Sequence, residues 1–146
     1  MNWTLVALLA IPGLMMGLLS VMGHTRGIEP YLWLVLAVFA TLVIARTAGE
    51  RYFLHGLAVG IAWGVLNGLV ATGLFWVYAR HNPEVMQRVQ AGGARIAPQA
   101  MFLMSAPLIG LATGVVLGLL CWGVSHVIQP APPDRIWPAL TDEKGE

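Results

Sequence analysis

Four long apolar stretches dominate this chain of 146 residues and limit what it can fold into. A helix needs roughly 20 mainly apolar residues to cross about 30 Å of hydrocarbon. Residues 3–23, 30–48, 52–79 and 101–128 meet that requirement. Charged residues make up only 10% of the chain, against about 25% in soluble domains. We therefore predict an all-α integral membrane protein, folded as a bundle of four transmembrane helices.

The same composition excludes several other classes of protein. The formal net charge of +1 provides no basic surface for a nucleic acid, so we expect no nucleic-acid partner. The apolar stretches do not alternate as the strands of a membrane barrel do. Residues 1–4 contain no Lys or Arg, so we expect the first stretch to remain as a span rather than be cleaved as a signal peptide. The single cysteine, Cys121, cannot form an internal disulfide, and we interpret it as a small buried residue.

The connection between the third and fourth stretches is long enough to hold a helix of its own. Asn82, Pro83 and Glu84 form a helix start, with Asn82 as the expected cap and Pro83 at the first position. The apolar residues that follow would share one face of this helix: Val85, Met86 and Val89. We predict a short amphipathic helix over residues 83–91 that lies on the membrane surface. A lid or a docking surface is the alternative.

The C-terminal residues 129–146 differ from the rest of the chain. Four prolines exclude a regular helix, and the end is acidic, so we predict an extended tail. Within it lies an apolar group formed by Ile136, Trp137 and Leu140. An exposed Ile-Trp pair is poorly tolerated in water, so this group is a candidate for docking on a partner or on the protein's own bundle. An unstructured tail with a chance apolar group is the alternative.

The positive charges do not decide the orientation in the membrane. With four spans, one side of the membrane holds Arg46, Arg51, Arg135 and Lys144, and the other holds Arg26, Arg80, Arg88 and Arg95. The positive-inside rule favours neither orientation, because the count is four against four. We expect a bacterial inner membrane with both termini in the cytoplasm. A dual-topology protein would show the same tie.

Small residues recur every four positions in three of the four stretches. They are Gly13 and Gly17 in the first, Gly56, Gly60, Gly64 and Gly68 in the third, and Ala106, Gly110, Gly114 and Gly118 in the fourth. Residues four apart share one face of a helix, and small residues let two helices approach closely in lipid. We predict that these faces pack against each other within one chain. Contact with a second subunit is the alternative, which makes a homo-oligomer or a larger membrane complex an expected assembly.

Three polar residues fall near the centres of the last three stretches. They are Thr41, Asn67 and Thr113. Most such residues serve helix packing, where a hydrogen bond between helices contributes about 1 kcal/mol. If they met in one polar layer, they would form a narrow pore or a small-solute site. A small-solute channel or carrier is therefore the second functional hypothesis.

Other candidate sites in the sequence are weaker. His55 and His126 are expected on one side of the membrane and His24 and His81 on the other, so each pair is a weak candidate for holding haem or a pigment metal. Apart from this third hypothesis, we predict no cofactor and no metal site. Glu29, Glu50 and Glu84 lie in predicted loops, which argues against a proton-coupled carrier. No catalytic residues are predicted, because no constellation of nucleophile, base and acid is present.

One overall arrangement resembles a known family. The Asn82-Pro83-Glu84 opening of the third loop, followed by Ala106-Pro107 and spaced glycines, is similar to a bacterial four-span membrane family catalogued as a domain of unknown function. The likeness covers most of residues 30–128. It implies a four-span fold and carries over no activity. Our first functional hypothesis is a non-catalytic membrane subunit or scaffold that assembles through its glycine-lined faces.

Overall fold

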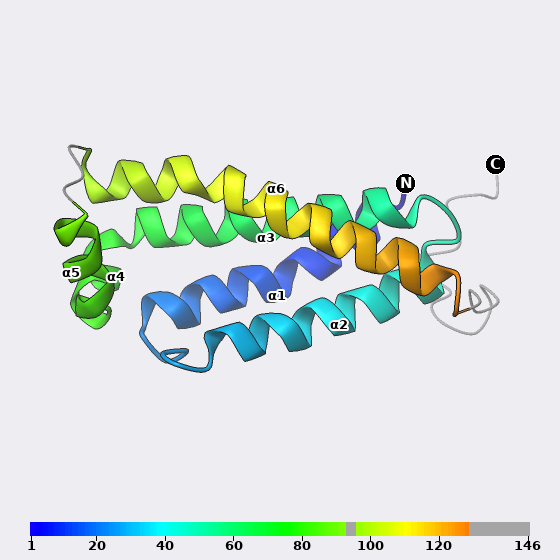
Figure 1. Cartoon of the computed structure of the whole chain (residues 1–146), viewed down its shortest axis with the longest axis horizontal. Helices are drawn as coiled ribbons and strands as arrows, with labels where there is room; N and C mark the ends of the chain where they lie inside the picture. Colours follow the sequence, from blue (N-terminus) through cyan, green and yellow to red (C-terminus); the bar gives the residue numbers. More distant parts are fainter. Residues whose placement is uncertain (93–95, 129–146) are drawn as a thin grey trace.

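The computed structural model describes residues 1–92 and 96–128, and helices account for most of them (Figure 1). They are α1 (Trp3–Val21), α2 (Glu29–Thr47), α3 (Tyr52–Gly73), α4 (Phe75–His81), α5 (Pro83–Ala91) and α6 (Pro98–Ser125). The described residues contain no strand. Four helices, α1, α2, α3 and α6, are long and apolar enough to cross a membrane. The protein is therefore an all-α bundle of four membrane-spanning helices. The predicted docking group of the tail, Ile136, Trp137 and Leu140, lies outside the described residues.

The helix ends lie within three residues of the predicted ones, except in the third stretch. The predicted span 52–79 is not continuous, because the helix is interrupted at Leu74, where φ is −105° and ψ is 30°. Gly73 immediately precedes this break, and glycine is among the weakest helix formers. The chain then begins α4, which together with α5 covers one end of the bundle (Figure 1).

Two helix starts differ from the expected ones. Glu29 does not lie in a loop, because it is the first residue of α2. Asn82 precedes α5 as expected, but its side chain does not cap that helix. Its Nδ2 instead donates hydrogen bonds to the carbonyl oxygens of Ser20 and Tyr78, both at 3.1 Å. Asn82 therefore ties the start of α5 to α1 and α4.

The most extensive contact among the four spanning helices is the one between α3 and α6, which lie side by side along the length of the molecule (Figure 1). α1 packs mainly against α3, and α2 packs mainly against α6. We call the end that holds residue 1 the N-terminal end, and the opposite one the α5 end. The tight turn from α2 to α3 lies at the N-terminal end, where Gly49 adopts a φ of 65° that favours glycine.

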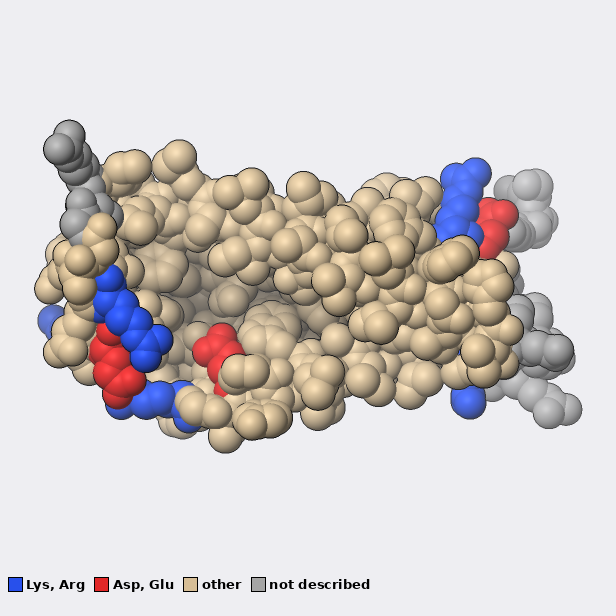
Figure 2. Space-filling view, viewed as in Figure 1, with Lys and Arg blue, Asp and Glu red and all other residues tan. Residues whose placement is uncertain are grey.

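The packed core does not extend evenly along the bundle. Its buried apolar residues come from all four spanning helices: Leu5, Val6, Leu9, Ala40, Ile44, Val59, Trp63, Leu117 and Cys121. Those from α2 all belong to its second half, which lies toward the N-terminal end. Charged side chains gather at the two ends of the molecule, with a wide uncharged zone between them (Figure 2). This distribution fits a protein whose middle faces lipid.

Candidate functional site

The small-residue faces of α3 and α6 meet inside one chain. Four pairs follow one another along this contact: Gly56 with Gly118, Gly60 with Gly114, Gly64 with Gly110, and Gly68 with Ala106. A Cβ atom added at Gly56 would lie only 2.7 Å from the Gly118 Cα. The two backbones are therefore in direct contact, which small residues alone permit. Because both faces are covered, neither is available to a second subunit.

The glycines of α1 pack against large side chains of α3 rather than against other small residues. Gly13 lies against the ring of Trp63, and Gly17 lies against Asn67 and Val70, on a different face of α3 from the glycines. The Trp63 Nε1–H donates a 2.7 Å hydrogen bond to the carbonyl of Leu9. Trp63 is thus a central packing residue that the sequence interpretation left unassigned. The Pro12-Gly13 pair was the sequence signal for this contact, since a residue without a side chain leaves room on α1 for a large ring.

The three mid-membrane polar residues do not form one layer. Thr41 lies near the N-terminal end, where its Oγ1 is 4.0 Å from the Cys121 Sγ. Asn67 lies toward the α5 end beside Gly17 of α1. Thr113 lies between these depths and lines a groove between α2 and α6. Counting residues from the centre of each stretch ignores helix tilt and rotation, and these decide which side chains meet.

The histidines are not arranged as a pair of free ligands. His55 is 1% exposed, and its Nε2 accepts a 2.9 Å hydrogen bond from the backbone N–H of Asn2. Its Nδ1–H therefore donates to the Arg51 carbonyl at 3.0 Å, so both ring nitrogens are occupied. His24, His81 and His126 are exposed. Within residues 1–92 and 96–128, no group of three or more His, Cys, Asp or Glu side chains could hold a metal ion.

A polar cluster at the α5 end was not expected from the sequence. The Glu29 carboxylate, half-buried at the start of α2, accepts hydrogen bonds from three neutral side chains. The donors are Ser20 Oγ at 3.3 Å, Thr25 Oγ1 at 3.3 Å and Trp33 Nε1 at 3.4 Å. The carboxylate thereby links the end of α1, the first loop and the first turns of α2.

Tyr78 of α4 completes this cluster. Burial of its phenol, together with the negative charge of Glu29, raises the pKa of Tyr78 above its usual value near 10. Its ring also packs edge-on against Phe102 of α6, with centroids 5.1 Å apart. Beside it, Arg26 donates a hydrogen bond to the His81 carbonyl and lies 3.9 Å from the Glu84 carboxylate. Arg26 thus joins the first loop to α4 and α5.

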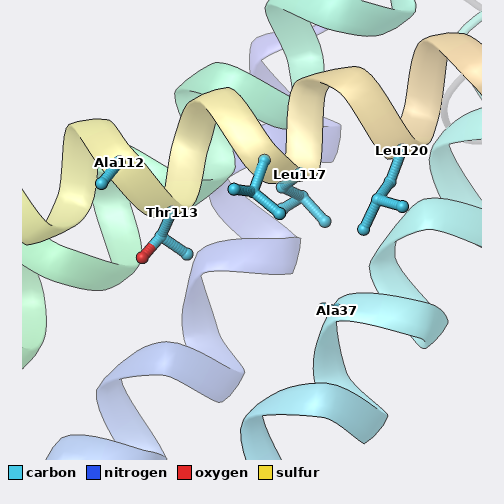
Figure 3. Close-up of a pocket in the computed structure, with 6 residues that line it drawn as sticks. Ala37, Ala112, Thr113, Leu117 and Leu120 are labelled. Carbon is cyan, nitrogen blue, oxygen red and sulfur yellow. The ribbon is translucent and has the colours of Figure 1, made fainter.

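One face of the molecule is hollowed. Figure 2 shows this recess, with an acidic side chain at its border near the α5 end. On the α2 side, Trp33 stands between Glu29 and the core, with its ring centroid 5.5 Å from that of Trp63. Farther along α2 lies an apolar groove of about 320 Å³, which we call the α2–α6 groove (Figure 3). Its lining residues are Ala37, Ala112, Thr113, Val116, Leu117 and Leu120.

The groups around Glu29 determine which ligand chemistry this site offers. In the described part of the chain, Glu29 has no second carboxylate, nucleophilic cysteine or imidazole among its hydrogen-bond partners. A carboxylate among neutral donors can accept further hydrogen bonds from a cation. The chain matches no protein-family model, no curated protein and no solved structure. The resemblance to a bacterial four-span family therefore receives no support from these comparisons.

Proposed function

We propose that this protein is a non-catalytic integral membrane subunit that acts by associating with another membrane-embedded chain. The observation that carries the proposal is the uneven packing of α2. Its buried residues are Ala40, Thr41, Ile44 and Ala45, all in the second half of a 19-residue helix. The other three spanning helices carry buried residues in both halves.

The surface that this proposal assigns to a partner is the outer side of α2. Leu34, Val35 and Val38 are more than half exposed there. The glycine-lined faces, which the sequence favoured for assembly, are already covered by contacts inside the chain. An assembly of this protein would therefore depend on large apolar side chains packing side by side, with van der Waals contact as the attraction in lipid.

We favour this proposal over the channel hypothesis because Thr41, Asn67 and Thr113 have different neighbours at different depths. The haem hypothesis is weakened because both ring nitrogens of His55 are hydrogen-bonded. The proposed location is a bacterial inner membrane, with both termini in the cytoplasm. The even number of spans supports placing residue 1 and the end of α6 on the same side.

The test is photo-crosslinking from matched positions, followed by native mass measurement after extraction from the host in a mild detergent. Val35 on α2 and Leu108 on α6 are both apolar and are 64% and 69% exposed. A photoreactive residue at Val35 should give one product of discrete mass, and the native mass should exceed that of one chain. Leu108 should give none. A monomer that crosslinks at neither position contradicts the proposal.

A further inference from the structure

Among the described residues, the Glu29 carboxylate has no positively charged partner. Its three hydrogen-bond donors are neutral, and their distances of 3.3–3.4 Å exceed the roughly 2.5–2.9 Å usual for hydrogen bonds that involve an ionised group. No Lys, Arg or His nitrogen of residues 1–92 and 96–128 lies within 4.0 Å of it. Arg26, the cation next to Thr25 in the first loop, pairs instead with Glu84. The carboxylate therefore retains acceptor capacity for a cation.

The position of Glu29 in the fold limits which kind of molecule could carry that positive charge. Glu29 is the first residue of a spanning helix, so it lies at the depth of lipid headgroups. Glu29, Trp33 and Ala37 follow each other at intervals of four and share one side of α2. Glu29 and Ala37 are eight residues apart, or about 12 Å along the helix. This side of α2 therefore joins a carboxylate at headgroup depth to an apolar groove at acyl-chain depth.

We propose that the protein binds a membrane lipid with a primary ammonium headgroup, which Glu29 holds while an acyl chain lies in the α2–α6 groove. The ammonium offers three N–H donors to a carboxylate that accepts only long, neutral hydrogen bonds. The groove, about 320 Å³ in volume and lined by Ala37, Thr113 and Leu117 among others, is at the small end of ligand pockets.

Two other occupants fit these observations less well. A divalent metal ion prefers several oxygen ligands that include more than one charge, and Glu29 is the single carboxylate of the described cluster. A partner helix about 10 Å across is too wide for a groove of this volume. The lipid site uses the inner side of α2, so it does not depend on whether a partner covers the outer side.

The first experiment uses the unmodified protein. It is purified in a mild detergent, and the lipid retained per chain is measured by native mass spectrometry against a methylation series. Phosphatidylethanolamine, its N-methyl and N,N-dimethyl forms and phosphatidylcholine have the same acyl chains and lose one N–H donor at each step. Retention should fall along the series, by about tenfold overall, the change expected from losing a hydrogen bond to a charged group. Equal retention of all four lipids overturns the proposal, and preference for phosphatidylglycerol does so as well.

The second experiment assigns the site with matched variants. Glu29→Gln should abolish the difference between phosphatidylethanolamine and phosphatidylcholine. Glu84→Gln removes a carboxylate at the same end of the molecule, from exposed α5, and should leave that difference unchanged. Ala37→Phe fills the groove and should lower retention of both lipids equally. Unchanged headgroup selectivity in a folded Glu29→Gln protein overturns the assignment, and the methylation series still decides the headgroup preference if that variant does not fold.

Discussion

The contacts of α3 and those of α2 represent two different ways of packing a helix in a membrane. The glycines of α3 bring its backbone against that of α6 from Gly56 to Gly68, with no space left for a side chain. α2 contributes fully buried residues to the core only from its second half. From its first half, Trp33, Leu36 and Ala37 pack against the core while they remain partly exposed.

This difference separates the part of the molecule that maintains the fold from the part that can bind. Close backbone contact gains dispersion energy over a long surface and tolerates no insertion. The start of α2 instead gathers polar and aromatic side chains around a half-buried carboxylate. In this protein the polar side chains are those around Glu29, and the aromatic ones are Trp33 and Tyr78. Three predictions test the comparison, in order of decreasing effect.

The largest effect is expected at the contact between α3 and α6. Gly60→Ile should destabilise the bundle by about 3 kcal/mol or more, because the new side chain would overlap the backbone of Gly114. Thermal unfolding in detergent measures the change. Gly123→Ile is the control, since nothing lies within 4 Å of a Cβ at that position of α6. Equal melting temperatures for the two variants would show that the two backbones are not in contact.

A smaller effect on stability is expected at the two tryptophans that contact each other, Trp63 and Trp33. Trp63→Phe removes the donor to the Leu9 carbonyl inside the core and should cost about 1–3 kcal/mol. Trp33→Phe removes the 3.4 Å hydrogen bond to Glu29 and part of a ring that is only partly buried against the core, so it should cost less, about 1 kcal/mol. Both are measured by unfolding in the same detergent. A larger cost at Trp33 would contradict the division into a packed core and an open recess.

The smallest effect is expected in the titration of Tyr78. The difference in alkaline absorbance between the wild type and Tyr78→Phe isolates this phenol, and its midpoint should lie above pH 10. Glu29→Gln should lower that midpoint only in part, because burial is the larger cause of the raised pKa. Since the folded state holds the proton more tightly, Tyr78 should reduce stability as the pH rises above about 10. A midpoint at pH 10 would mean that the phenol is open to water.

Much of the fold could be predicted from the sequence because its signals are local. Span lengths follow from apolar runs, and the start of α5 follows from Pro83. The interruption at Leu74 was missed because the residues from Tyr52 to Ala79 remain apolar on both sides of it. Hydropathy measures the preference for lipid, and it does not report where a helix bends or stops.

Less of the candidate site could be predicted. Thr41, Asn67 and Thr113 were grouped by depth, yet each helix presents its polar residue to a different neighbour. Glu29 was assigned to a loop, because a charge beside Pro30 normally marks the end of a span. Only the fold shows that Ser20, Thr25 and Trp33 converge on its carboxylate.

The sequence by itself determined that four helices cross a membrane and that several of them carry faces of small residues. The tertiary structure decided which faces meet, because glycine spacing specifies a flat surface without naming its partner. It also decided that α2 buries residues fully only in its second half, and that Ser20, Thr25 and Trp33 converge on Glu29 at its start. The physical reason is that apolar runs and spacing depend on neighbours along the chain. A binding site depends instead on the tilt and rotation of helices far apart in sequence.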